Sequence, residues 1–519
     1  MAKKFYTFDC ETDPFKFGRI PQPFIWGCFD GKEYWQFNTA DEFAQFIKNQ
    51  DALFYAHNGG KFDFHFLAKH INRNEKILMI NSRLVKANIG KAEIRDSYAL
   101  IPFPLSAYKK DDFDYTKLEK NVREKHKEEI QKYLKNDCVY LWELINEFFT
   151  EYGRHLTAPG AAIKMLQKIE KIKIGNPGQF FFNEFQKYYY GGRCECLKPG
   201  SHYGEINYFD INSAYPYAMQ HQHPFGEDYE IKYYDNPPII PWGFYTVLAK
   251  SYGAFCRREN GGLKFDWDGE EREYHVTGWE LKAALETHKC VIIKHLEQKF
   301  FSESKSFTDF INHFWNLRQT TKKGSAQNLF CKLMMNSAYG KFAANPENYS
   351  QFVLFDPEIA EYLVGEGWEL RGEIGPHIIA SQPLDEYDMR FYNVATGASI
   401  TGFVRSMLIR ALTSVDKPIY CDTDSIIFQG KHSLRLSDNL GAWGIDGIFD
   451  EGHFAGKKLY AVKNKDGEKL ASKGSKLKYN EIVKIAGGQT IIYEQEAPVF
   501  SWFKDTRILT RNIKRTVAQ

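Results

Sequence analysis

The stretch Tyr420-Cys421-Asp422-Thr423-Asp424-Ser425 places two carboxylates between apolar runs that favour β-strands. This pattern predicts a hairpin with the acidic residues in its turn. Neighbouring carboxylates repel one another and favour protonation, and bound divalent cations relieve that repulsion. A solvated acidic turn is the alternative interpretation when this stretch is taken alone.

A second acidic strand end lies upstream, at Ile206-Asn207-Tyr208-Phe209-Asp210. The residues that follow it include Ser213 and Tyr215, immediately before a proline. Because Asp210 also comes at the end of an apolar strand, we expect it to join the acidic hairpin in one cluster of carboxylates.

A helical candidate from about 307 to 339 lies between these two acidic segments. At about 100° per residue, a continuous helix would place three cations, an amide and a phenol on one stripe. The residues on this stripe are Arg318, Lys322, Lys332, Asn336 and Tyr339. Cations on one stripe repel one another unless an anion such as a triphosphate lies against them. Gly324 can interrupt the helix, and a solvated basic face is the alternative.

A separate group of carboxylates occupies the first 140 residues. Asp9 and Glu11 lie two apart at a strand end and point to one face. A Gly-Gly turn leads from an apolar strand to Asp63, and Tyr133 shares a helix face with Asp137. Four carboxylates suit Mg²⁺ or Mn²⁺, and two such ions can stabilise the attacking hydroxide and leaving 3′ oxygen of a phosphodiester. A polar turn and a surface Asp are the alternatives for the single pieces.

These segments together resemble family B DNA polymerases. The segments around Asp9, Asp63 and Asp137 match the Exo I, Exo II and Exo III motifs of that family. Those around Asp210, Lys332 and 422–424 match motifs A, B and C. The matches run from residue 9 to residue 460, so the resemblance covers most of the chain.

Three shorter matches accompany these motifs. Tyr189-Tyr190-Gly191-Gly192 matches the Tyr-x-Gly-Gly motif that links the exonuclease and polymerase parts. Lys458-Leu459-Tyr460 resembles the Lys-x-Tyr motif that holds the primer terminus. Asp96-Ser97-Tyr98 resembles the Ser/Thr-Leu motif that binds the 3′ end, but Tyr98 replaces the usual Leu.

The resemblance implies an α/β multidomain fold, with an RNase H-like 3′-5′ exonuclease domain and a right-hand polymerase of palm, fingers and thumb. Two insertions are also expected. The expected ranges are 1–155 for the exonuclease domain, 156–205 for a linker and the start of the palm, 206–254 for the palm with motif A, 255–308 for an insertion (terminal-protein region 1), 309–343 for the fingers, 344–390 for a second insertion (terminal-protein region 2), 391–450 for the palm with motif C, and 451–519 for the thumb.

The resemblance also assigns roles to single residues. Asp210 and Asp424 would hold two Mg²⁺ or Mn²⁺ ions with the help of Asp422. The exonuclease ion pair would be held by Asp9, Glu11, Asp63 and Asp137, with Tyr133 orienting the attacking water. Nucleotide-binding residues would be Tyr215, which excludes a 2′-OH, Lys332, which neutralises the triphosphate, and Arg318, Lys322, Asn336 and Tyr339. DNA-binding residues would be Asn58, Phe62, Ser97, Tyr189, Gly191, Gly192, Ser213, Gly340, Thr423, Lys458 and Tyr460.

The layout most resembles the protein-primed polymerases of small bacteriophages and linear plasmids. The exonuclease motifs begin at residue 9, and the 90 residues from Lys332 to Asp422 leave room for an insertion. This resemblance implies a terminal protein as primer, template-primer DNA and dNTPs as partners, and processive, strand-displacing synthesis. A conventionally primed family B polymerase is the alternative, as is an exonuclease with a DNA-binding pseudo-polymerase half.

Composition sets outer limits on these interpretations. Hydrophobic residues make up 43% and charged residues 26% of 519, which excludes an intrinsically disordered chain. No apolar run approaches the ~20 residues of a membrane helix, and no signal-peptide core is present, so we expect a cytosolic monomer, in the host cytoplasm if viral. Nine scattered cysteines argue against disulfides and structural zinc.

The distribution of charge is more informative than its sum. A net charge of +2 is weak for a nucleic-acid-binding protein, but 457–519 contains 14 Lys and Arg against 6 Asp and Glu. A basic C-terminal region beside acidic active sites predicts a surface that grips DNA phosphates. A solvated basic face is the alternative.

Overall fold

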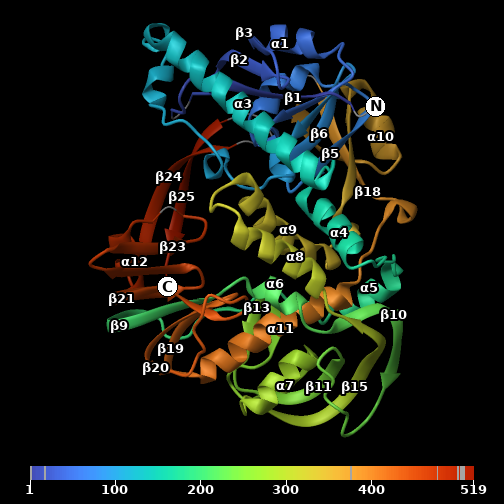
Figure 1. Ribbon diagram of the computed structural model, residues 1–519, viewed down its shortest axis with the longest axis vertical. Helices are drawn as coiled ribbons and strands as arrows, with labels where there is room; N and C mark the ends of the chain where they lie inside the picture. Colours follow the sequence, from blue (N-terminus) through green and yellow to red (C-terminus); the bar gives the residue numbers. More distant parts are fainter. Residues whose placement is uncertain are drawn as a thin grey trace.

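A ten-stranded sheet, largely blue at the top of Figure 1, organises the N-terminal part of the chain. The computed structural model describes residues 3–16, 19–374, 377–475, 477–499, 502 and 509–518. The strands follow the order β17-β18-β16-β5-β6-β7-β4-β1-β2-β3. The N-terminal ones are β1 (Phe5–Thr12), β2 (Pro23–Phe29), β3 (Tyr34–Phe37), β4 (Leu53–Ala56), β5 (Glu75–Ile80), β6 (Arg83–Ile89) and β7 (Ala92–Asp96).

Helices cover both faces of the central strand β1. On one face, α1 (Ala40–Ile47) packs Phe43 against Phe8, with ring centroids 4.9 Å apart. On the other face, α3 (Lys127–Tyr152) accepts a hydrogen bond from Thr7 Oγ1 at the Cys138 carbonyl, 2.7 Å away. Since side chains alternate along a strand, Asp9 shares the face of Thr7 and is directed toward α3.

Three strands from far along the sequence extend this sheet. They are β16 (Ser350–Phe355), β17 (Glu369–Ile374) and β18 (His377–Pro383), and β16 pairs antiparallel with β5. An ion pair of 3.0 Å between Arg73 and Asp356 lies beside this junction. The segment expected as the second insertion, 344–390, is therefore built onto the N-terminal sheet.

A seven-stranded sheet carries the acidic segments around Asp210 and 422–424. Its order is β23-β22-β21-β9-β20-β19-β8. The bounds are β8 Cys194–Cys196, β9 Gly200–Ile211, β19 Val415–Asp422, β20 Ser425–His432, β21 Trp443–Gly456, β22 Leu459–Asn464 and β23 Gly467–Ser472. The almost wholly buried helix α11 (Val394–Thr413) and the short α6 (Ala214–Met219) pack beside it.

A four-stranded sheet forms the lower part of the molecule in Figure 1. It combines β10 (His223–Lys232), β15 (Cys290–Lys305), β11 (Phe244–Ser251) and β14 (Glu271–Thr277), and a hairpin of β12 (Cys256–Glu259) and β13 (Gly262–Phe265) lies apart from it. Helix α7 (Gly278–Glu286) begins with a capping box between Thr277 and Glu280. The expected first insertion, 255–308, thus shares its sheet with two strands that precede residue 255.

The single long helix expected from about 307 to 339 is wrong. The structure has two helices, α8 (Thr308–Thr320) and α9 (Ala326–Phe342), joined by a turn. Helix α8 ends at Thr320 with the extended residue Thr321 as its C-cap, and Gly324, just before α9, has φ +84, a left-handed conformation that glycine adopts readily. Ser325 then caps α9 by accepting the N–H of Asn328. The predicted stripe of cations assumed about 100° per residue along one continuous helix. Since the helix is interrupted, that spacing no longer places Arg318 and Lys322 on the same face as Lys332.

The C-terminal module reaches back to the N-terminal one. It contains α12 (Tyr479–Ala486) and the antiparallel pair β24 (Ile491–Val499) and β25 (Leu509–Val517). Trp502 is fully buried, and its Nε1 donates to the Gly60 carbonyl at 2.7 Å while its ring stacks on His65. The remaining helices of the described residues are α2 (Asp63–Leu67), which begins with Asp63, α4 (Ala158–Ile169), α5 (Gly178–Gln186) and α10 (Ala360–Gly365), with several 3-10 turns between elements. Within the described residues, no helix is long and apolar enough to span a bilayer.

Gly324, in the α8–α9 turn, and Gly340, inside α9, provide a matched test of backbone conformation. A Cβ added at Gly324 or at Gly340 meets nothing within 4 Å, so neither substitution creates a clash. Gly324→Ala should destabilise the protein by about 1 kcal/mol because of its positive φ, whereas Gly340→Ala, inside α9, should stabilise it by about 0.5–1 kcal/mol. Chemical denaturation of both variants measures this, and equal effects would contradict the left-handed conformation of Gly324.

Candidate active sites

Strand pairing brings the three C-terminal carboxylates to one end of the seven-stranded sheet. Ser425 pairs with Asp210 across β20 and β9, and Ile211 donates its N–H to the Asp424 carbonyl at 2.8 Å. Asp422 ends β19, and the turn to β20 follows at once. The predicted hairpin and its union with Asp210 are therefore both present.

Burial and mutual repulsion perturb these carboxyl groups. Burial, followed by the charges of Asp424 and Asp446, raises the pKa of Asp210 to about 7. Burial and the charge of Asp422 raise the pKa of Asp424 to about 6. Lys458 offsets part of this charge, since its Nζ lies 2.8 Å from Asp422 Oδ2. The site is thus short of positive charge near Asp210 and Asp424.

The Tyr-x-Gly-Gly segment, 189–192, and the adjacent Arg193 pack against the acidic turn 422–424. Thr423 has φ +61, and its N–H donates to the carbonyl of Arg193 at 2.6 Å. Gly192 lies so close that an added Cβ would be 2.7 Å from Thr423 Oγ1. Arg193 is fully buried, and its Nη1 donates to the carbonyl of Gly253 at 2.7 Å. A side chain at position 192 would therefore displace the turn that carries the carboxylates.

Two tyrosines from different helices stack beside the carboxylates. The rings of Tyr215, on α6, and Tyr339, on α9, are 4.1 Å apart and inclined by 4°. Lys332 and Asn336 are exposed on α9, and the charge of Lys332 lowers the pKa of both Asp210 and Asp424. The structure therefore brings the motif B residues of α9 to the same site as the carboxylates.

Several other predicted DNA-binding residues of the C-terminal half have defined local contacts. Ser213 adopts a left-handed conformation with φ +53 and precedes α6. Tyr460 contacts Tyr208 through their hydroxyl groups at 3.1 Å, and Tyr420 accepts the N–H of Lys458 at 3.0 Å. Tyr189 accepts a hydrogen bond from Arg258, and Gly191 one from Arg405, each at its backbone carbonyl.

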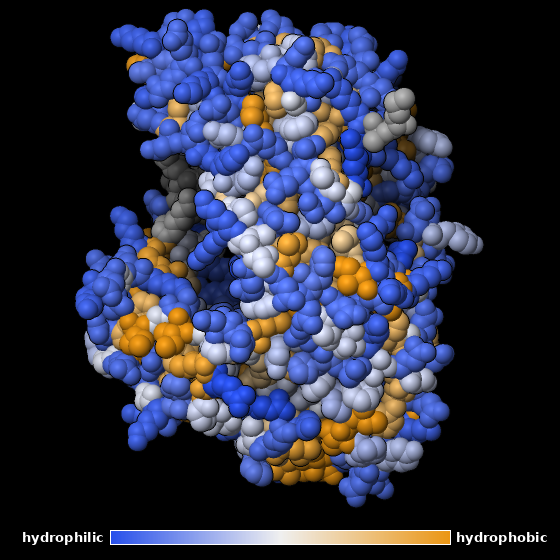
Figure 2. Space-filling view, in the orientation of Figure 1, coloured by the Kyte–Doolittle hydropathy of each residue, from blue (hydrophilic) through white to orange (hydrophobic). Residues whose placement is uncertain are grey.

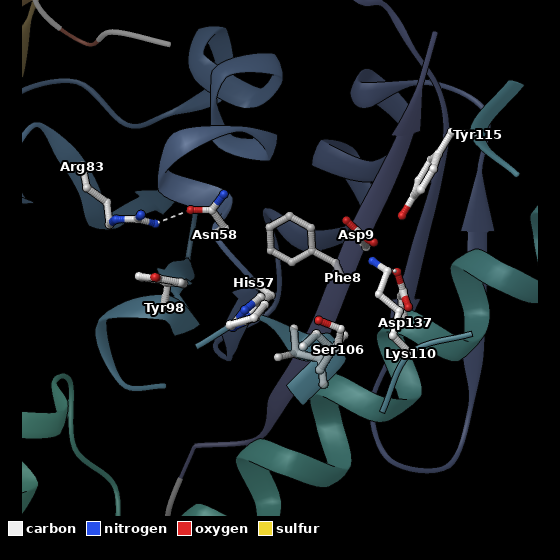
Figure 3. Close-up of a pocket in the computed structure, with 13 residues that line it drawn as sticks. Phe8, Asp9, His57, Asn58, Arg83, Tyr98, Ser106, Lys110, Tyr115 and Asp137 are labelled. Atoms are coloured by element: carbon white, nitrogen blue, oxygen red, sulfur yellow. Dashed lines mark hydrogen bonds and ion pairs between the residues drawn. The ribbon is translucent and has the colours of Figure 1, made fainter. Parts of the chain in front are cut away.

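The N-terminal carboxylates line or lie beneath a cavity of about 610 Å³. Asp9 and Asp137 line it, as Figure 3 shows, while Glu11 and Asp63 are buried next to them. Burial raises the pKa of all four groups, and the charges of the other three add to the shift of Asp9. The predicted gathering of four carboxylates therefore exists in the fold.

Residues that the sequence reasoning missed complete this cavity. Lys110 extends its Nζ to 3.3 Å from Asp137 Oδ2, and the hydroxyl of Tyr115 lies 3.0 Å from that of Tyr133. Arg83 lines the opposite end. A charged run around Lys110 is visible in the sequence, but its spacing has no helical or strand relation to the carboxylates that would have linked them.

The predicted ligands of a single-stranded 3′ end take different positions. Asn58 is exposed, with φ +63, and accepts a hydrogen bond from Arg83 at 2.7 Å. Phe62 contacts the rings of Phe15 and Phe66. Ser97 is fully buried, and its hydroxyl lies 3.0 Å from His57 Nδ1, so its local role is to position that ring.

The donor groups of both clusters fit Mg²⁺ or Mn²⁺. In the described part of the chain, no group of three or more Asp, Glu, His or Cys side chains is arranged closely enough to hold a metal ion. The chemistry nevertheless suits hard cations, because every donor is a carboxylate. In addition, Asp63 Oδ1 and Asp137 Oδ1 are buried without a hydrogen-bond partner. A cation would give these atoms the partners that the protein does not supply.

Comparison with known proteins identifies the family. Residues 103–370 match the family model for DNA polymerase type B, organellar and viral. A DNA-directed DNA polymerase of Enterobacteria phage PRD1 is 35% identical, over 99% of this chain and 98% of its own length. The chain belongs to this family.

A more distant relative matches along most of its length and has the same fold. The DNA polymerase of Bacillus phage phi29 is 26% identical over 94% of this chain and 92% of its own. The solved structure of phi29 DNA polymerase with primer-template DNA and incoming nucleotides superposes with a TM-score of 0.76, at 20% identity over 100% of both chains. The expected α/β multidomain fold, with exonuclease, palm, fingers and thumb domains, is confirmed, as is the expected DNA-directed DNA polymerase.

The close approach of Gly192 to Thr423 yields a prediction for the polymerase turn. Gly192→Ala should reduce primer extension at least tenfold, because the new methyl group displaces Thr423 and the carboxylates beside it. Combining it with Thr423→Gly removes the contacted atoms and tolerates φ +61, so extension should partly recover. Gly191→Ala, which meets nothing within 4 Å, serves as the control in the same assay. A Gly192→Ala enzyme as active as this control would show that the turn does not depend on the glycine.

Proposed function

We propose that this polymerase replicates a viral or plasmid genome from a terminal-protein primer and proofreads with a 3′-5′ exonuclease. The observation that carries the exonuclease assignment is the cavity of about 610 Å³, which has four perturbed carboxylates at one end. This cluster lies on the N-terminal sheet, whereas the polymerase carboxylates lie on the seven-stranded sheet. Two separate reactions on one chain account for two separate acidic clusters.

In the polymerase reaction, the primer 3′ hydroxyl attacks the α-phosphate in line and pyrophosphate leaves. Divalent ions on Asp210 and Asp424 would activate the hydroxyl and neutralise the developing charge. Lys332 and Asn336 are exposed on α9, where they would contact the triphosphate. Arg318, in the last turn of α8, and Lys322, in the α8–α9 turn, would add positive charge to the same site. Tyr215 packs under the sugar and excludes a 2′-OH.

In the exonuclease reaction, Asp9, Glu11, Asp63 and Asp137 would hold the ions that activate a water and stabilise the leaving 3′ oxygen. Tyr133 orients that water, and its hydroxyl is held by Tyr115 at 3.0 Å. Lys110 is well placed to stabilise the negative charge on the phosphate, since its Nζ already lies beside Asp137.

Several features support the grip on DNA and the primer assignment. Lys457, Lys458, Lys473 and Arg515 line a cavity of about 320 Å³ between the palm and the C-terminal hairpin, a basic site suited to duplex phosphates. Trp502 ties the C-terminal region to the N-terminal sheet, which favours a closed path around DNA and strand displacement. The relatives named above are DNA polymerases of bacteriophages, which supports a viral genome as the template. The terminal-protein partner and action in a host cytoplasm follow from the resemblance of the sequence layout to protein-primed polymerases.

Separate substitutions should separate the two activities. Asp424→Ala should abolish primer extension and leave degradation of single strands within about twofold of wild type, because the clusters lie on different sheets. Asp9→Ala with Glu11→Ala should do the reverse. Extension and degradation of one labelled oligonucleotide, with Mg²⁺ and with EDTA as control, measure both; loss of both activities in either variant would refute the two-site assignment.

Strand displacement and the nature of the primer can be tested on a circular template. A labelled primer on a single-stranded minicircle, with Mg²⁺ and dNTPs and no other protein, should give products many circle-lengths long. Extension that halts after one lap would instead favour the conventionally primed alternative. Addition of a hydroxyl-bearing terminal protein to a blunt linear template should then be required for initiation.

A further inference from the structure

The hairpin β12–β13 lies within the segment expected as the first insertion, 255–308, and packs on the Tyr-x-Gly-Gly segment. It forms a two-stranded sheet of its own. Its buried residues Cys256 and Phe265 make a small hydrophobic cluster with Tyr190. Because Tyr190 directly precedes the two glycines beside the acidic turn, the hairpin reaches the support of the polymerase carboxylates from outside the seven-stranded sheet.

Hydrogen bonds join the hairpin and the residues flanking it to both ends of this segment. At one end, Arg258 on β12 donates to the carbonyl of Tyr189 at 2.7 Å. At the other end, Nε1 of Trp267 donates to Glu195 Oε1 at 3.0 Å. The backbone between these two contacts includes Gly192, which touches Thr423 of the acidic turn. The segment is therefore held on either side of the point where it meets the turn.

Arg193 links these contacts to the acidic turn. Its guanidinium is fully buried, donates from Nε to Glu195 Oε2 at 2.6 Å, and lies 4.2 Å from the ring centroid of Phe265. Its Nη1 donates to the carbonyl of Gly253, just before the hairpin, while its own carbonyl accepts the N–H of Thr423. Since a buried charge is costly to separate from its partners, the backbone at Arg193 has to follow the hairpin.

The same hairpin also contacts the chain beside Asp422. Lys457 donates from Nζ to the carbonyl of Leu263, on β13, at 2.7 Å. The next residue, Lys458, has its Nζ 2.8 Å from Asp422 Oδ2. The hairpin thus holds two neighbours of the acidic turn, the backbone at Arg193 and the chain at Lys457.

We propose that the hairpin β12–β13 positions the acidic turn 422–424 for the polymerase reaction, with Arg193 and Arg258 as positioning residues. The proposal rests on the assignment of this turn to the polymerase site. The turn requires support because Asp422 and Asp424 repel one another and Thr423 holds a left-handed backbone conformation. The resemblance gives this part of the chain contact with a terminal protein, so a role in the polymerase site itself is additional.

A matched pair of substitutions on the hairpin tests this role. Arg258→Met removes the hydrogen bond to the Tyr189 carbonyl, whereas Lys264→Met removes the same charge from an exposed ion pair with Glu259. Arg258→Met should lower kcat for primer extension about fivefold and leave the KM for the dNTP within about twofold, because a displaced turn slows the chemical step without removing a nucleotide contact. Lys264→Met should match wild type. Both side chains are exposed, so neither substitution should prevent folding.

Substitution of Arg193 should have the larger effect. Arg193→Met combined with Glu195→Gln removes both members of the buried ion pair and should lower kcat about tenfold. The Mg²⁺ concentration that gives the half-maximal rate should rise about threefold, since contacts behind the ligands tune metal affinity. This concentration does not depend on the fraction of enzyme that is folded. Arg193→Lys retains a donor for the Gly253 carbonyl and should restore part of both values.

Metal binding provides a readout that does not require catalysis. Calorimetric titration with Mn²⁺ measures it, and the Asp424→Ala variant identifies the part of the signal that belongs to the polymerase site. Arg258→Met should weaken this binding about threefold, because the displaced turn no longer presents its carboxylates together. Lys264→Met should leave it unchanged.

The outcomes separate failure of this inference from failure of the site assignment. Retention of primer extension by Asp424→Ala would overturn the assignment of the turn, and the role of the hairpin with it. If Asp424→Ala abolishes extension, Arg258→Met with the kcat and Mn²⁺ affinity of Lys264→Met would overturn the role of the hairpin alone. So would a slower Arg193 double variant whose half-saturating Mg²⁺ concentration is that of wild type, since its defect would then be one of folding.

Discussion

Burial of carboxylates, together with their mutual repulsion, is the constraint on which both acidic clusters depend. The fold holds Asp210 beside Asp424 through paired strands, and it buries Glu11 and Asp63 next to Asp9. An acid whose pKa is raised in the folded state binds its proton more tightly there than in the unfolded chain. Without cations, the contribution of Asp210 to stability is therefore lost as pH rises from 3.8 to about 7. Bound divalent ions reverse that penalty, so folding prepares the sites for metal.

The supports that hold these carboxylates against repulsion are mainly backbone contacts. Strands β9 and β20 lock one side of the polymerase cluster, and the Arg193 carbonyl holds Thr423. In the N-terminal cluster, strand β1 is packed between helices on both faces. Hydrogen bonds between backbone groups rearrange less readily than contacts between side chains. The sheets therefore fix the positions of the carboxylates, while the side chains of Lys458 and Lys110 offset part of the negative charge of Asp422 and Asp137.

The sequence was informative where function requires particular residue types at short spacing. The acidic hairpin at 422–424, the strand end at Asp210 and the carboxylate pair on β1 all follow from alternation and local apolar runs. Prediction from the sequence failed where the structure depends on contacts between residues far apart in the chain. The pairing of β16 with β5 and the anchoring of Trp502 on Gly60 leave no local pattern. The interrupted helix at Gly324 was visible as a possibility, but neighbouring helical propensity favoured continuity.

The stacked tyrosines show how geometry limits the polymerase site itself. Tyr215 and Tyr339 lie 4.1 Å apart and almost parallel, so no base can occupy the space between their rings. Tyr339 belongs to α9, which packs with α8 as a pair, whereas Tyr215 belongs to α6 beside the carboxylates. If a base pair is to rest on Tyr339 while the sugar rests on Tyr215, the rings have to part. In the proposed mechanism, discrimination against a 2′-OH by Tyr215 would then be coupled to movement of the α8–α9 pair relative to the sheet when a nucleotide binds.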